Sequence, residues 1–281
     1  MTDAPTLDGL RRAVAGRLRA ISDSPDLDAR RLIEAITGLN GARLIIEGNR
    51  PVEPGVAARL DTAVARRLAG EPLAYIVGQI GFHELDLRVT PDVLVPRPDT
   101  ETLVEAVLSR LPGQAALHIA DLGTGSGAIA LALAHARPRW QLLATDAHAN
   151  ALTVARRNAE RLGVPNVAFA EGDWYDALAG ARFDAIVSNP PYIDPADPHL
   201  DDPALRHEPR HALVAQAHGL ADIVQITTGA RTHLRPGGAL FVEHGHTQGA
   251  DVRRLFAAAA LIDVETLPDM AGHARVTLGH A

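Results

Sequence analysis

The sequence contains no cysteine and no lysine among its 281 residues. The absence of cysteine excludes disulfide bonds, thiol nucleophiles and cysteine-ligated metal sites. Arginine supplies all 27 of the strongly basic residues. Together with the abundance of alanine, this indicates a composition bias of the genome, and we give it no functional weight.

Long apolar runs are also missing. No stretch approaches the roughly 18 apolar residues of a membrane-spanning helix, and the first ten residues resemble no secretory signal. The formal net charge of −7 lowers the expectation of nucleic-acid binding, which usually requires a basic face. We therefore expect a cytoplasmic monomer that contacts neither membranes nor nucleic acid directly.

The apolar residues that are present predict helices between residues 6 and 69. They recur at intervals of three and four, which is typical of amphipathic helices. Proline stands near the first turn of two of them, at Pro25 and Pro54. The predicted stripes are Leu7, Leu10, Val14, Leu18 and Ile21; Leu27, Leu32, Ile33 and Ile36; a short 44–46; and Val56, Leu60, Val64 and Leu68. Residues 1–72 are thus expected to form a small helical bundle.

A different pattern begins after this bundle. Residues 73–97 are interpreted as a β connector, with a hairpin around Gly78–Gly81. A helix is expected after Asp99. The following strands are predicted at 118–122, 141–146, 167–171, 183–188, 238–243, 262–267 and 274–279, and the helices between them at 127–136, 149–162, 220–234 and 248–260. This alternation predicts an α/β domain at 98–281, with a mostly parallel sheet covered by helices on both faces.

A glycine-rich loop, Asp-Leu-Gly-Thr-Gly-Ser-Gly at 121–127, lies at a predicted strand-to-helix junction. Glycines there let the backbone turn tightly and approach a ligand. Asp146 ends the next strand, where such folds place a carboxylate on ribose hydroxyls. The third glycine comes one residue earlier than in G-x-G-x-x-G, which favours a methyltransferase over a nicotinamide enzyme. The alternatives left open are a nicotinamide enzyme and a glycine-rich turn that holds no ligand.

The segment Ser-Asn-Pro-Pro-Tyr at 188–192 follows the fourth predicted strand. The side-chain carbonyl of Asn189 and the main-chain carbonyl of Pro190 are two hydrogen-bond acceptors that suit a planar NH₂ group. Pro190 and Pro191 stiffen the backbone, and Tyr192 offers a flat face for stacking. The pattern therefore indicates methyl transfer to a weakly nucleophilic nitrogen, as against a loop that is merely stiffened by proline.

These motifs occur together with three further segments: Tyr-Ile-Val-Gly at 75–78, Val-Pro-Arg-Pro-Asp-Thr-Glu at 95–101, and Glu-His-Gly at 243–245 with Arg-Val-Thr at 275–277. In this combination the chain resembles the HemK/PrmC family of protein-(glutamine-N5) methyltransferases, over nearly its whole length. The resemblance implies a Rossmann-like class-I methyltransferase domain with an antiparallel last strand. It also implies S-adenosylmethionine as cofactor and class-I peptide release factors as partners, methylated on the glutamine of their Gly-Gly-Gln motif.

The resemblance also assigns residues. It implies that Arg97–Glu101 walls the methionine pocket and that Trp174 lies near the adenine. The catalytic set would be Asn189, Pro190 and Tyr192, and the substrate-binding set would add Pro191. The implied cofactor-binding residues are Asp121, Gly123, Thr124, Gly125, Ser126, Gly127, Asp146, Trp174 and Asn189. Residues 269–275 are looser than the family pattern, and we assign them no role.

Other features carry less weight. His244 and His246 beside Glu243 are a weak metal signal without further ligands, so no metal is expected. Arginine pairs in the predicted helices fit a solvated face. Aspartates and prolines between residues 194 and 203 predict a long mobile loop that closes over the substrate.

Two alternative functions stay open at this point. The first is a nucleic-acid amino-methyltransferase that acts on adenine N6 or guanine N2, because the same motif serves that nitrogen chemistry. The acidic balance and the lack of a basic appended domain oppose it. The second is a non-catalytic adaptor, which the intact cofactor loop and the intact Asn-Pro-Pro-Tyr motif oppose.

Overall fold

The computed structural model describes residues 5–281, and their contacts divide into two compact units. The helical unit runs to Gln79 and also includes Asp201–His207. The α/β unit comprises Ile80–Leu200 and Glu208–Ala281. Within residues 5–281, no helix is both long and apolar enough to cross a membrane.

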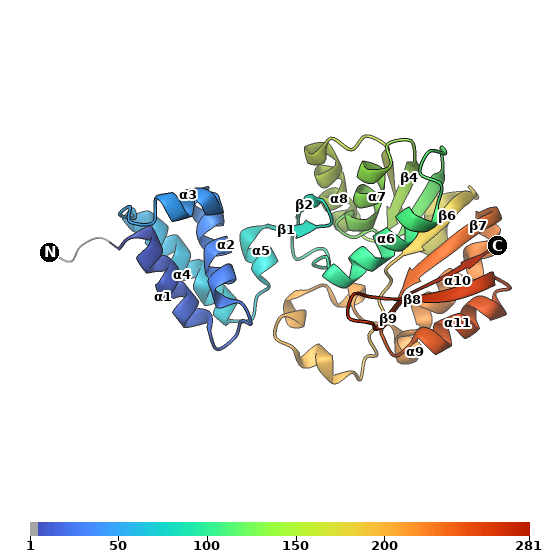
Figure 1. Ribbon diagram of the computed structural model, residues 1–281. Coiled ribbons are helices and arrows are strands. Elements are labelled where there is room, and N and C mark those ends of the chain that lie inside the picture. The colour runs from blue at the N-terminus through green and yellow to red at the C-terminus, as the bar shows by residue number, and fades with distance from the viewer. Residues whose placement is uncertain (1–4) are drawn as a thin grey trace. The chain divides into compact units, whose positions relative to one another are not determined.

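Five helices form the helical unit (Figure 1). They are α1 (Leu7–Leu18), α2 (Pro25–Thr37), α3 (Gly41–Ile46), α4 (Pro54–Leu68) and α5 (Leu73–Val77). Side-chain caps begin two of them: the Thr6 hydroxyl accepts from Gly9 N at 3.2 Å, and Asn40 Oδ1 accepts from Arg43 N at 2.9 Å. Proline begins α2 and α4, as expected.

The predicted apolar stripes build the core of this unit, with five exceptions, of which Leu27 and Leu68 are 44% and 43% exposed. Leu18, Leu32, Ile33 and Val64 are almost completely buried. However, α1 ends at Leu18, so Ile21 falls beyond the helix and is 41% exposed. Ile45 and Ile46 are 84% and 81% exposed, because α3 has too few turns to bury more than one face.

Part of the Asp- and Pro-rich loop packs against the end of α4 inside the helical unit. Pro203 lies beside Gly70, where an added Cβ would come within 2.7 Å of the proline Cβ. The ring of His207 lies 3.4 Å from the Ala69 carbonyl oxygen. Residues 201–207 therefore have a fixed packing partner in the helical unit.

The connector differs from its prediction. The expected hairpin around Gly78–Gly81 is wrong in position, because α5 continues to Val77 and Gly78 caps it with a φ of 78° and a bond from its N–H to Ala74 O. The hairpin comes later: β1 (Gln79–Phe82) and β2 (Leu85–Arg88) join at His83 and Glu84. The Asn158 carboxamide bonds to the backbone of Arg88 and Ser126, so it links this hairpin to the glycine loop.

A seven-stranded sheet with the order β5-β4-β3-β6-β7-β9-β8 forms the centre of the α/β unit. Its strands are β3 (His118–Leu122), β4 (Gln141–Asp146), β5 (Val167–Glu171), β6 (Phe183–Ser188), β7 (Leu234–Glu243), β8 (Ile262–Pro268) and β9 (Ala274–His280). Strand β9 pairs antiparallel with both of its neighbours, and the pairs between the other strands are parallel. The predicted fold, including the antiparallel last strand, is confirmed.

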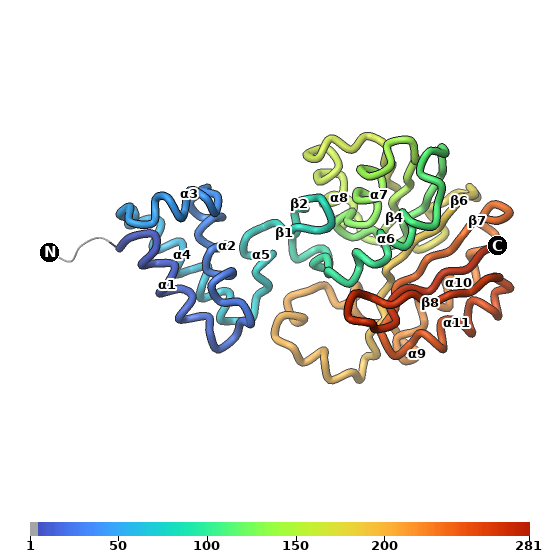
Figure 2. Tube along the Cα trace, in the orientation of Figure 1, coloured from blue at the N-terminus to red at the C-terminus, as the bar shows by residue number. Residues whose placement is uncertain are grey.

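Helices cover both faces of this sheet (Figure 1). Alternate strand residues point to opposite faces: Ile119 packs with α6 and α7, whereas Ala120 packs with α10 and α11. The helices are α6 (Glu101–Arg110), α7 (Ala128–Ala136), α8 (Ala149–Leu162), α10 (Ala221–His233) and α11 (Gly249–Ala258). The chain between β6 and the short α9 (Gln216–Gly219) can be followed in Figure 2; it contains only three short 3-10 helices.

Candidate active site

A pocket opens at the carboxyl ends of β3, β4 and β6, where Leu122, Thr145 and Ser188 stand in neighbouring register. Parallel α/β sheets bind ligands at this edge. Predicted site residues in the lining are Gly123, Thr124, Gly125, Ser126, Asp146, Trp174, Asn189 and Pro191, with Arg97 and Thr100 from the predicted wall. Asp121, Gly127, Pro190 and Tyr192 lie outside the lining.

The glycine loop has the backbone that its sequence requires. Gly123, Gly125 and Gly127 have φ values of 74°, 57° and 86°, in the left-handed region that favours glycine. Gly127 does not line the pocket: an added Cβ would lie 2.9 Å from Leu131 Cδ1 and 3.2 Å from Ala155 Cβ. Its place is structural, because it lets α7 begin close to α8.

Asp146 is tied to that loop. Its Oδ2 accepts from Gly125 N at 2.9 Å, and its Oδ1 accepts from His148 N at 2.9 Å. The ring of His148 stacks on that of His211 with 3.6 Å between the centroids. His211 comes from the long segment after β6, so this pair joins that segment to the pocket rim.

Asp121 lies behind the loop and is fully buried. Its Oδ2 accepts from Thr124 Oγ1 at 2.6 Å and from Ala130 N at 3.3 Å. Its Oδ1 is buried without a hydrogen-bond partner among residues 5–281. Burial raises the pKa of Asp121 to about 7, and the nearby charge of Asp146 acts in the same direction.

Trp174 forms part of the opposite wall. An added Cβ at Gly123 would meet its ring at 3.4 Å, so the indole lies over the loop backbone. Trp174 has a φ of 41°, a strained value for a bulky side chain. The Asp222 carboxyl group on α10 also lines the pocket; burial raises its pKa, and the neighbouring Trp174 side chain acts in the opposite direction. Sequence reasoning missed Asp222, because it lies 48 positions away in a helix without a motif.

Asn189 follows β6, is half-buried, and faces the pocket. Its Nδ2 donates to Thr100 Oγ1 at 3.0 Å. Thr100 is buried at the junction of the 3-10 helix η1 (Pro98–Thr100) with α6. Because the amide end of Asn189 is engaged, its carbonyl oxygen is left as an acceptor.

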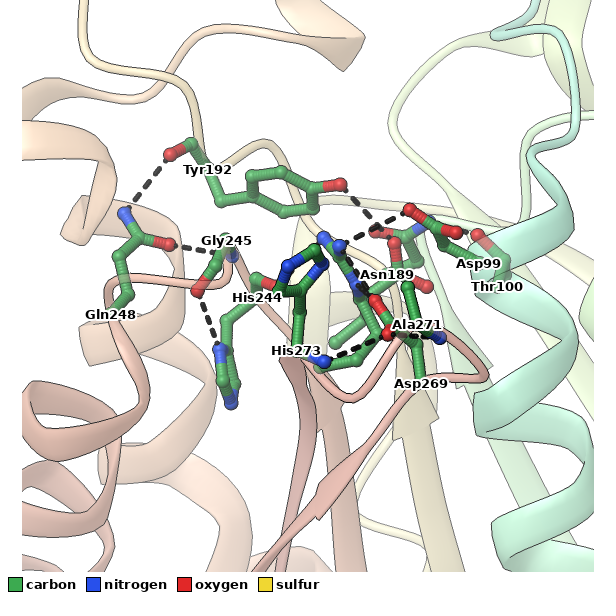
Figure 3. Close-up of polar contacts among 12 residues, drawn as sticks. Asp99, Thr100, Asn189, Tyr192, His244, Gly245, Gln248, Asp269, Ala271 and His273 are labelled. Atoms are coloured by element: carbon green, nitrogen blue, oxygen red, sulfur yellow. Dashed lines mark hydrogen bonds and ion pairs between the residues drawn. The ribbon is translucent and has the colours of Figure 1, made fainter.

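Tyr192 is held from two sides behind this position. Its hydroxyl donates to Glu243 Oε1 at 3.2 Å, and its main-chain carbonyl accepts from Gln248 Nε2 at 3.0 Å. Gln248 also accepts from Gly245 N at 2.9 Å (Figure 3). Burial, with the negative charge of Glu243 beside it, raises the pKa of Tyr192, so the phenol stays protonated and acts as a donor.

The segment after β8, to which we assigned no role, forms a compact turn beneath Tyr192. Asp269 accepts from the N–H groups of Ala271 and His273 at 2.9 Å each (Figure 3). It also pairs with Arg275 at 3.0 Å, and Arg275 in turn reaches Asp99 at 3.1 Å. Asp269 and Arg275 are both buried. The sequence analysis included both residues in the segment without a role, and it missed that they pair with each other and that Asp99 from η1 joins them.

The two histidines considered for metal binding take other partners. The buried ring of His244 is hydrogen-bonded to Gly245 O and Thr277 Oγ1, at 2.9 Å each. His246 lies against the ring of His273. Among the described residues, no cluster of three or more His, Asp or Glu is placed to hold a metal ion.

Comparison with known proteins gives matches over both parts of the chain. The family described as methyltransferase small domain matches residues 98–201, and the family described as PrmC N-terminal domain matches residues 10–78. A methyltransferase structure from Pyrococcus furiosus has a TM-score of 0.54 at 21% identity, covering 78% of this chain and 98% of that one. That likeness supports the class-I methyltransferase fold alone.

Curated relatives decide the family. The release factor glutamine methyltransferase of Salmonella typhimurium is 48% identical over 258 residues, which is 92% of this chain and 93% of that protein. The Escherichia coli protein with the same name is 47% identical over 270 residues, 96% of each chain. The identity extends over the helical unit as well as the pocket. A nucleic-acid amino-methyltransferase or a non-catalytic adaptor would not account for similarity over both parts. The chain therefore belongs to the family of release factor glutamine methyltransferases.

Proposed function

We propose that this protein transfers a methyl group to the side-chain amide nitrogen N5 of the glutamine in the Gly-Gly-Gln motif of class-I peptide release factors. The family supports the release factor as substrate and methyl transfer as reaction. The orientation of the Asn189 side chain is the observation that supports an amide nitrogen as the methyl acceptor. Its Nδ2 is bound to Thr100, so Oδ1 is presented to a substrate NH₂ group.

S-adenosylmethionine, the cosubstrate of this methyltransferase family, supplies an electrophilic methyl group on its sulfonium. The pocket residues fit such a molecule. Asp146 stands where a ribose would meet a carboxylate, and Trp174 offers a flat face for an adenine. The unpartnered Oδ1 of Asp121 lies behind the loop and suits the positive methionine end.

The residues after β6 would then hold the acceptor amide. An amide nitrogen is a weak nucleophile because its lone pair is delocalised. Two acceptors, Asn189 Oδ1 and the Pro190 carbonyl oxygen, would fix both of its N–H groups, and the ring of Tyr192 would stack on the amide plane. The proton can leave after methyl transfer, so no strong base is needed. Flanking glycines would let the glutamine side chain extend into the cleft.

Residues 1–72 are proposed to recognise the body of the release factor. A helical unit adds nothing that cofactor chemistry requires, but a second contact raises the effective concentration of the substrate loop. The domain from 98 to 281 and its connector at 73–97 supply the whole lining of the pocket, and we propose that the protein works as a monomer.

The test compares three substrates with labelled S-adenosylmethionine: a release factor, the same factor with the glutamine of its Gly-Gly-Gln motif changed to glutamate, and unmethylated DNA or ribosomal RNA. Label is expected only in the first, with one added methyl group located on that glutamine by mass spectrometry. The Asn189→Ala enzyme serves as the control and should bind cofactor but lose most turnover. Label in the factor that carries glutamate would show that the methyl acceptor is a different residue. Label in nucleic acid alone would overturn the proposal.

A further inference from the structure

Glu243 is a charged residue without exposure to solvent at the end of β7. Its Oε1 accepts from the Tyr192 hydroxyl, and its Oε2 is buried without a hydrogen-bond partner among residues 5–281. The Thr100 hydroxyl is a neighbour of the same carboxyl group that lowers its pKa, and its rotatable hydrogen is available to the unpartnered Oε2. Glu243 therefore lies next to Tyr192 and Thr100, which Figure 3 shows in the polar network around Asn189.

The hydrogen on Thr100 Oγ1 decides how Asn189 is oriented. A hydroxyl has one hydrogen and two lone pairs. If Thr100 gives its hydrogen to the Glu243 carboxylate, only lone pairs are left for Asn189, which must then donate through Nδ2, as observed at 3.0 Å. If Thr100 instead donated to Asn189, the carboxamide would turn over and present its NH₂ group to the NH₂ group of the substrate. Two donors would then face each other.

We infer that Glu243 is a positioning residue that, as an acceptor for Thr100 and Tyr192, fixes the Asn189 carbonyl oxygen and the Tyr192 ring for the substrate amide. This inference rests on the proposed methyl transfer at Asn189. Glu243 itself touches neither substrate nor cofactor. It acts by setting the direction of the hydrogen bonds that run from Asn189 through Thr100 to its own carboxylate.

The proton on Glu243 consequently controls the network. Burial raises the pKa of Glu243 to about 7, against the lowering effects of Thr100, Arg275 and Tyr192; Asp99 raises it further. These are the charged and titratable groups that face it, from η1, β9 and the segment after β6. His244 points elsewhere, toward Thr277, and Asp269 is paired with Arg275. Below pH 7 a protonated Glu243 would become a donor, and the direction of the network would no longer be defined.

The main test is Glu243→Gln, which keeps the shape but adds a donor. With both substrates saturating, wild-type kcat should rise between pH 6 and pH 8 around a midpoint near 7. The variant should lose roughly 10- to 100-fold in kcat, the scale of a misplaced acceptor, and its kcat should be independent of pH in this range. Its affinity for S-adenosylmethionine should stay within about 2-fold, because Glu243 does not line the pocket.

Matched variants separate this role from stability. Thr100→Val removes the hydroxyl and should copy Glu243→Gln, whereas Thr100→Ser restores it and should stay within roughly 3-fold of wild type. Glu265→Gln, an exposed change on β8, should alter nothing. Wild-type kcat with an unchanged pH profile in Glu243→Gln, or in Thr100→Val, would overturn the inference.

A second readout does not depend on methyl transfer. The chain has six asparagines, so selective ¹⁵N labelling gives few side-chain NH₂ signals, and the Asn189 pair is assigned by its loss in Asn189→Ala. That pair should shift with a midpoint near pH 7 in wild type and should not shift in Glu243→Gln. A pair that does not respond to pH in wild type would refute the network, even if release factors are methylated. An active network in a chain that methylates no release factor would instead refute the proposed function.

Discussion

Asp121 illustrates how a single residue behind the pocket wall is prepared for a charged ligand. One of its oxygens accepts hydrogen bonds from the Thr124 hydroxyl and the Ala130 N–H, and the other is buried without a hydrogen-bond partner among the described residues. A buried carboxylate without a cation is costly, which is why its pKa rises to about 7. A positive ligand near Oδ1 would favour the ionised form and release the proton.

This residue therefore predicts a pH dependence of cofactor binding. A group with a pKa near 7 is mostly protonated at pH 6 and mostly ionised at pH 8. Because a cation binds better to the ionised form, affinity for S-adenosylmethionine should increase by up to about 10-fold over this interval. Calorimetry in buffers of different ionisation enthalpy should also detect proton release on binding near pH 7.

Asp121→Asn is the control for that experiment. The amide keeps a carbonyl oxygen for Thr124 and Ala130, so the loop is preserved, but the titratable group is gone. The ratio of wild-type to variant affinity cancels any ionisation of the cofactor itself. If the ratio of the two affinities stays constant from pH 6 to pH 8, ionisation of Asp121 does not influence cofactor binding.

At the scale of elements, the short helix α9 supports the segment that carries Tyr192. Gly219 has a φ of 79°, and an added Cβ would lie 2.1 Å from Tyr192 O. The same carbonyl accepts the Gln248 side chain, so neither group has room to move aside. Ala217 and His218 just before it also have left-handed backbones, which indicates that tertiary contacts hold this turn.

Gly219→Ala is expected to disturb both stability and turnover. A left-handed alanine costs about 1–2 kcal/mol, and the contact with Tyr192 should add roughly 1–3 kcal/mol of overpacking. The matched control is Gly180→Ala, which has a φ of 78° and nothing within 4 Å of the added Cβ. Denaturant unfolding should show the larger loss at Gly219, and only that variant should lower kcat. Equal losses would mean that the contact has no effect.

At the scale of the whole molecule, the helical unit has a groove suited to a protein partner. Leu27, Ile45 and Ile46 line it, with Arg11 and Arg30 beside them. Ile45 and Ile46 are more than four-fifths exposed. Contiguous exposed apolar side chains on a folded protein commonly mark an interaction site, and the proposed occupant is the release factor.

Changing both Ile45 and Ile46 to serine should weaken recognition of the whole factor. We expect kcat/KM for the release factor to fall by roughly 10-fold or more, the effect of losing about 1.4 kcal/mol of contact. Activity on a short Gly-Gly-Gln peptide should not change. Exposed substitutions of this kind shift stability by only about 0.5 kcal/mol, and Ile262→Ser, exposed on β8, controls for lost surface apolarity. An unchanged kcat/KM on the whole factor would argue against recognition through this groove.

The sequence by itself determined most of the fold. The predicted strands at 118–122, 141–146, 167–171 and 183–188 coincide with β3, β4, β5 and β6. The side chains of β3, β4 and β6 are mostly buried on both faces, so apolar runs mark these strands clearly. The hairpin was misplaced because glycine marks turns and helix ends alike, and Gly78 caps α5 instead of turning a hairpin.

For the site, the sequence identified the glycine loop, Asp146 and the residues after β6, because close backbone approach and amide chemistry demand particular residue types at fixed spacing. Only the tertiary structure decided what surrounds them. Glu243, Arg275 and Gln248 come from three separate elements, and nothing in their local sequence says that they meet beneath Tyr192. Hydrogen-bond direction and burial depend on neighbours brought together by the sheet, which is why the support of Asn189 and Tyr192 became visible only in the folded chain.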